Sequence, residues 1–147
     1  MERSGEDLAG GDARTLSFAG YRIDAGLLDQ LMHYQRGLLE QLSEGWSPTA
    51  MASAHRLALA GSGLSQDVVE RALAVVRRFA GNREVARRLR ASLERVTSGR
   101  GEDLRQRLDA LDRELRERDD PETVSLLLRN EDTLLDLHRR VSRLLGH

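Results

Sequence analysis

The stretch GSGLSQDVVERAL, residues 61–73, decides how this chain is organised. Two glycines end one helical pattern, and Ser65 is the residue type that caps the start of the next helix by accepting a bond from a backbone N–H. Leu64 and Val69 stand at the spacing of a hydrophobic staple. Apolar residues then recur every three or four positions as far as Phe79, so this helix is expected to lie at the centre of the core.

The same signals recur on both sides of this stretch. Asp24 is a predicted N-cap, and the leucine-rich pattern that follows it should end at Gly45. A second helix should start at Ser47-Pro48, because proline suits the first turn, with Trp46 packed on Met51. The chain therefore reads as one helix after another, and no segment has the alternation of a strand.

These signals divide the chain into three parts. Residues 1–19 are rich in glycine, serine and charge, which predicts a disordered tail. Gly81 and Asn82 should break or bend the helical pattern, so residues 20–97 are expected to form a region of four helices. After the linker TSGRG at 97–101, residues 98–147 should form a C-terminal antiparallel helical hairpin that turns at Asp120. The pattern leaves open whether this hairpin packs on the four helices or projects from them.

The first helix of that hairpin carries a narrow leucine seam that resembles a short coiled coil. Acidic residues stand four positions before arginines along its outer face, which favours helix formation. The seam is our candidate partner-binding surface, and it consists of Leu104, Leu108, Leu111 and Leu115; the acid–arginine pairs are Asp103/Arg107, Asp109/Arg113, Asp112/Arg116 and Glu114/Arg118. In the last helix, Asn130 falls near the seam position one heptad before Leu137, where a buried asparagine would fix the register or the oligomeric state. The alternative is that the heptad frame is off by one and Asn130 is exposed.

Composition narrows the classes of function. The 147 residues have a net charge of −1, so no overall charge steers the chain towards nucleic acid or membrane. There is no cysteine, which excludes disulfides and thiolate chemistry. All 23 basic residues are arginine, a bias typical of a GC-rich bacterial genome. The first residues contain no apolar run, and no segment is long and apolar enough for a membrane helix, so we expect a cytoplasmic protein.

Charge is divided unevenly along the chain. Residues 66–100 hold nine arginines and four acids, whereas residues 101–147 hold nine arginines and twelve acids. Two arrangements are compatible with this division. The acidic C-terminal part could lie against the basic helix and neutralise it, or a partner could bind the basic or the acidic surface. Arg83, Arg87 and Arg90 share one helix face and form a candidate basic face for phosphates or an acidic partner.

A DNA-binding alternative rests on LALAGSGLSQDVVERAL, residues 57–73, which resembles a helix-turn-helix motif. The residues that would enter the DNA groove come from the first turns after Ser65. Two of them, Asp67 and Glu70, are acids that phosphates repel. The sequence therefore favours a capped core helix, and a small DNA-binding regulator that dimerises through its hairpin is the alternative.

No group of residues has the spacing of a catalytic or cofactor site, so we expect no enzyme activity and no cofactor. The four histidines are His33, His55, His138 and His147, and no two form a metal-binding pair on one predicted helix. A metal carrier or helical enzyme that combines His33 with Glu40 or His55 is the third hypothesis. The favoured one is a non-enzymatic helical module that binds another protein or itself, as an adaptor, assembly factor or oligomerising subunit.

Overall fold

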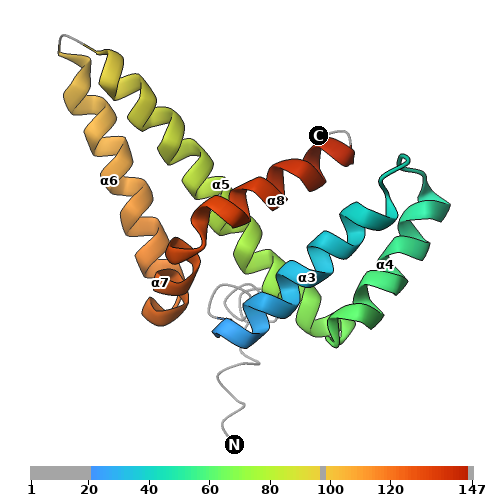
Figure 1. The fold of residues 1–147 in the computed structure, drawn as a ribbon. Helices are drawn as coiled ribbons and strands as arrows, with labels where there is room; N and C mark the ends of the chain where they lie inside the picture. The colour runs from blue at the N-terminus through green and yellow to red at the C-terminus, as the bar shows by residue number, and fades with distance from the viewer. Residues whose placement is uncertain (1–20, 97–98, 146–147) are drawn as a thin grey trace, which may run out of the picture.

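Helices make up all the regular structure in residues 21–96 and 99–145, the part of the chain that the computed structural model describes (Figure 1). The all-α class predicted from the sequence is therefore confirmed for these residues. The helices are α3 (Ala25–Gln41), α4 (Pro48–Ser62), α5 (Gln66–Arg95), α6 (Arg100–Arg118), α7 (Pro121–Arg129) and α8 (Glu131–Leu144). The predicted tail at 1–19 lies outside the described residues.

Capping side chains set four of the helix starts, as predicted. Each cap accepts a hydrogen bond from the backbone N–H three residues later, at 2.8–3.2 Å. This bond satisfies one of the amide groups that the first turn of a helix leaves without a partner. The four caps are Asp24 for α3, Ser47 for α4, Ser65 for α5 and Asp120 for α7.

Of the break or bend predicted at Gly81 and Asn82, the break is wrong, because α5 runs without interruption through both residues. A glycine inside a helix costs only about 1 kcal/mol relative to alanine, and the packing of the flanking turns outweighs that cost. Phe79 and Ala80 on one side and Ala86 on the other are all buried. The third and fourth predicted helices are therefore one helix of 30 residues.

The first half of α5 lies in the centre of the hydrophobic core, as predicted. Val69, Val75, Val76 and Phe79 are each at most 2% exposed, and they pack with buried side chains of α3, α4, α7 and α8. In Figure 1, α3 and α4 form a hairpin at one end of α5, and α8 crosses α5 and lies against α3. Gly37 allows α3 and α4 to approach closely, because a Cβ there would stand 3.1 Å from Ala58 Cβ.

The predicted C-terminal hairpin pairs the wrong helices. α6 runs back beside the second half of α5, and the chain after Pro121 turns away from α6 to cross α5 (Figure 1). The last helix is also two helices, because Asn130 ends α7 and starts α8. Its side chain donates to the carbonyl oxygen of Leu126 at 2.9 Å instead of occupying a seam position.

Two smaller predictions about helix ends differ from the structure. α3 ends at Gln41 with Leu42 as its C-cap, so Gly45 lies further along the turn, where its φ of 120° requires glycine. Gly61 is inside α4, and Gly63 alone forms the left-handed C-cap. Trp46 is 49% exposed, and its packing on Met51 stays a prediction.

Candidate protein-binding groove

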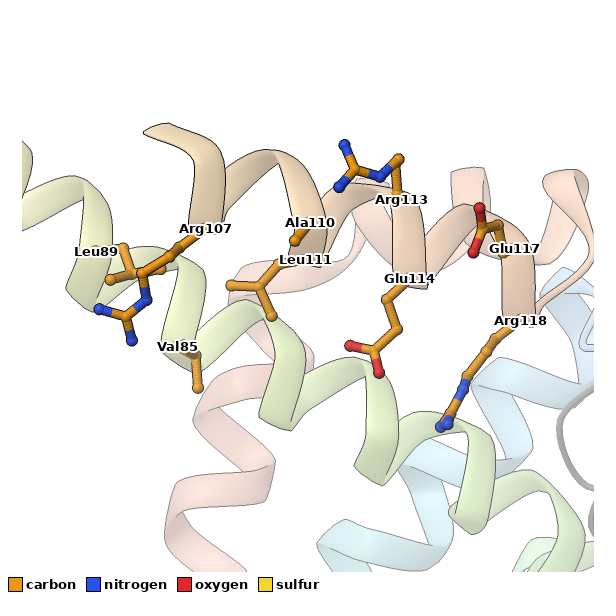
Figure 2. A pocket seen from close by; sticks show the side chains of 9 residues that line it. All are labelled: Val85, Leu89, Arg107, Ala110, Leu111, Arg113, Glu114, Glu117 and Arg118. Atoms are coloured by element: carbon orange, nitrogen blue, oxygen red, sulfur yellow. The ribbon is translucent and has the colours of Figure 1, made fainter. Parts of the chain in front are cut away.

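Two adjoining hollows between the second half of α5 and α6 form a groove, and Figure 2 shows the residues that line the larger one. Their volumes are about 630 Å³ and 340 Å³, and they share Val85 of α5 and Leu111 of α6. We call them together the α5–α6 groove. Its larger part is lined by Val85, Leu89, Arg107, Ala110, Leu111, Arg113, Glu114, Glu117 and Arg118.

Contacts at both ends of the groove and in its middle hold α6 in register with α5. In the middle, Asn82 Nδ2 donates to the carbonyl oxygen of Leu111 at 2.8 Å. At the end nearest the core, Arg78 donates to the Asp119 carboxylate at 2.9 Å. At the far end, α6 comes close to α5 at the buried Gly101, where an added Cβ would stand 3.6 Å from Leu93 Cδ1. α5 and α6 therefore form a defined two-helix arm.

The arm extends beyond the main core and leaves apolar side chains partly uncovered. Leu115 is 4% exposed and belongs to the core cluster, but the groove residues Val85 and Leu111 do not. Both are only half-buried, and Ala110 is exposed. Two helices bury one apolar stripe each against the other, and among the described residues no third helix covers the stripes on the groove side. Within this part of the chain, the floor of the groove is therefore an open aliphatic strip.

Charges of both signs border this strip, and they do not pair with each other. Arg107, Arg113, Glu114 and Glu117 form no ion pair or hydrogen bond with any residue in the described part of the chain. Figure 2 shows Glu114 and Arg118 extending from α6 towards α5, whereas Arg113 points away. Of the four acid–arginine pairs expected on α6, only Asp112–Arg116 forms among these residues, at 3.0 Å.

The leucine seam predicted from the sequence lies along α6, and its two ends have different surroundings. Leu115 packs in the core of the chain itself, and Leu111 lines the groove. Leu104 and Leu108 are half-buried on the outer part of the arm. The seam therefore faces α5 over part of its surface, and Leu111 is the member placed best for contact with a partner.

Arg83 and Arg87 of the predicted basic face are engaged within the chain. Arg83 is 5% exposed, with its Nε 3.4 Å from a Glu131 carboxylate oxygen. Arg87 binds the Glu131 and Asp132 carboxylates of α8 at 2.9 and 2.6 Å, and these bonds raise the pKa of its guanidinium. Arg90 is exposed. Acids of the C-terminal part thus pair with Arg83 and Arg87 of α5, whereas Arg90 stays at the surface.

The histidines do not assemble a metal site in the described residues, where no cluster of three or more possible ligands occurs. His33 is exposed beside a small hollow that Glu40 also lines. His55 lies between Tyr34 and Gln66: its Nδ1 is 2.7 Å from the Tyr34 hydroxyl, and its Nε2 is 3.0 Å from Gln66 Oε1. His147 lies outside the described residues.

The helix-turn-helix residues are bonded to their own neighbours. Gln66 contacts His55 and donates to Glu70 at 2.9 Å, and Asp67 lies 3.4 Å from Arg71. These side chains would have to exchange these bonds for contacts with DNA. DNA binding stays a prediction, and a mobility shift on random duplex DNA that weakens steeply with salt is its test.

Two residues that shape the groove were not recognised in the sequence. In the sequence, Asn82 has the character of a helix breaker, and its bond to the Leu111 carbonyl depends on the neighbouring helix, which sequence spacing does not reveal. Asp119 stands beside the predicted cap Asp120, and its burial against Arg78 likewise depends on tertiary contact. The only local signal was the double acid before proline in DDPET.

The groove combines an aliphatic floor with charged borders, and no group of catalytic residues lines it among the residues that the structure describes. Within the described residues, no helix is long and apolar enough to cross a lipid bilayer. Comparison of the chain with protein-family models, with curated proteins and with solved structures finds no match.

Proposed function

We propose that this chain is a non-enzymatic, self-associating helical module, and that its α5–α6 groove binds the α5–α6 arm of a second copy. The observation that carries the proposal is an open aliphatic strip bordered by charges of both signs that have no partner in the described chain. Two such arms placed face to face would form a four-helix arrangement that covers both strips, a common solution for amphipathic helices.

The charge of α6 supports a second copy as the occupant. Between Arg100 and Arg118 the helix carries six arginines and six acids, interspersed along its length. A surface with balanced charges is able to complement itself across a two-fold axis, where the same patch of each copy meets the other. A partner with only acidic or only basic side chains would form ion pairs with at most half of the charged residues of α6.

The spacing of two border residues specifies the pairing. Arg107 and Glu114 lie at equal distances in sequence from the midpoint between Ala110 and Leu111, in the middle of α6. If two α6 helices lie antiparallel about that midpoint, Arg107 of one copy stands opposite Glu114 of the other, twice. The small side chain of Ala110 then lies near the axis, where it lets the helices approach.

Ala110→Glu tests the proposal. Ala110 is exposed and lines the groove, so the substitution should leave the fold intact and place two like charges near the axis. We expect the wild-type chain to have a molar mass twice its 16.5 kDa by light scattering, and Ala110→Glu to have the mass of a single chain with an unchanged circular dichroism spectrum.

Ala91→Glu is the matched control, because Ala91 is exposed on α5 and does not line the groove. It should associate like the wild type. A wild-type mass of one chain at every concentration would refute self-association, and equal loss of association in both variants would place the contact elsewhere. If a different protein from the same cell forms a complex that Ala110→Glu prevents while the wild type alone is monomeric, the module is an adaptor instead.

A further inference from the structure

A third hollow, of about 300 Å³, lies between α3, α5 and α8, away from the α5–α6 groove. This volume is at the lower end of the range for small-molecule sites. Its apolar walls come from Leu38, Leu73, Val141 and Leu145. Because three helices distant in sequence enclose it, the hollow belongs to the folded core and does not depend on a second copy.

Among the described residues that line this hollow, the polar groups are basic or neutral and none is an acid. Arg77 and His138 line it from α5 and α8, with Ser142 one turn further along α8. Neither Arg77 nor His138 forms an ion pair or hydrogen bond in the described part of the chain. This contrasts with Arg78, Arg83 and Arg87 of the same helix, which bind carboxylates. The hollow therefore offers positive charge to an anion.

Gln35 is a second, independent feature of the hollow, because it calls for a hydrogen-bond donor on the ligand. It lines the hollow and is 6% exposed, and its Oε1 accepts no hydrogen bond from any described residue. A buried acceptor without a donor is costly, so such groups in proteins usually have a partner. A ligand with an N–H or O–H group would supply the missing donor.

We infer that the hollow between α3, α5 and α8 binds a small amphiphilic carboxylate that also carries an amide or hydroxyl donor. The carboxylate would lie between Arg77 and His138, and Ser142 is able to donate to it. The donor would reach Gln35, and the apolar body would pack on the leucines and valine of the walls. An N-acyl amino acid with a short acyl chain has all three features.

N-hexanoylglycine is the probe, and calorimetric titration of the full chain measures its binding. We expect saturable binding that weakens at least tenfold in Arg77→Gln. Arg77 is exposed, so this variant should fold. Arg88→Gln is the control, because Arg88 is also exposed on α5 but does not line the hollow. The methyl ester of the probe tests the charge, and octanoate, which lacks the amide, tests the donor; both should bind more weakly.

Gln35→Met separates a ligand-binding role from a purely structural one. Methionine has a similar shape and no acceptor oxygen, so the free variant should melt at or above the wild-type temperature while its affinity for N-hexanoylglycine falls. Absence of saturable binding to the wild type would overturn the inference, as would equal affinity in the wild type and Arg77→Gln. The same titration with Ala110→Glu should give the wild-type affinity, so failure of self-association does not affect this test.

Discussion

Asp119 shows how burial and charge oppose each other at a single residue. Its side chain is 3% exposed and lies 2.9 Å from Arg78, between the end of α6 and the core. Loss of water raises the pKa of the carboxyl, and the positive charges of Arg78 and Arg118 lower it by a smaller amount. The net effect is a raised pKa, so the ion pair does not fully replace the lost hydration.

The raised pKa predicts how stability depends on pH. The folded chain holds the Asp119 proton more tightly than the unfolded chain, where the pKa is about 3.9. The resulting stabilisation is present below that value and is lost as pH rises through the folded pKa. In urea titrations, the free energy of unfolding of the wild type minus that of Asp119→Asn should therefore be larger at pH 4 than at pH 7. A difference that grows with pH would mean that Arg78 dominates.

At the scale of the helix, short sequence patterns predict the structure correctly wherever the interaction joins residues close in sequence. The caps Asp24, Ser47, Ser65 and Asp120 bind the backbone three residues ahead, so spacing alone identifies them. The interruption expected at Gly81 is absent because the cost of one glycine is small compared with the burial of its neighbours. Helix propensity does not include that burial, because the burial depends on contacts with α3 and α8.

Gly81 also gives a prediction about α5. It has no unusual φ, and a Cβ there would meet no atom within 4 Å. Gly81→Ala should therefore stabilise the chain by about 0.5–1 kcal/mol, because alanine loses less backbone entropy in a helix. For a chain of this size, the melting temperature should rise by roughly 1–4 °C. A fall in melting temperature measured by calorimetry would show that α5 bends at Gly81 in solution.

At the scale of the whole molecule, the sequence does not predict which helices pack against each other. The short DDPET connection favours a hairpin of α6 with the last helix, but α8 packs on α3 and α5 and buries Leu134 and Leu137 in the core. Arg83, Arg87 and Arg139 join α5 to α8 through Glu131, Asp132 and Glu84, so ion pairs reinforce this choice. Among the described elements, α6 consequently has α5 as its neighbour along most of its length, and this leaves the groove open.

The sequence reveals the α6 side of the candidate site but not its α5 side. The seam leucines and the mixed charges of α6 are visible as a pattern, and they correctly marked this helix as amphipathic. The groove itself is not visible, because it needs the α5 residues Val85 and Leu89 opposite Leu111. The basic face looked available only because the acids that neutralise it come from α8, more than forty residues later.

Mixing two charge-reversed variants tests the central claim that α6 recognises its own copy across a two-fold axis. Arg107→Glu and Glu114→Arg should each disrupt the homodimer, because each places like charges opposite one another twice. The double variant Arg107→Glu/Glu114→Arg restores both opposite pairs and should associate again. These border residues are exposed and have no partner within the described chain, so the monomer should be unaffected.

The decisive measurement is the molar mass by light scattering of an equimolar mixture of Arg107→Glu and Glu114→Arg. The account predicts one-chain mass, 16.5 kDa, for each variant alone and twice that mass for the mixture. A mixture that keeps the mass of its separate components, or single variants that remain as associated as the wild type, would contradict it.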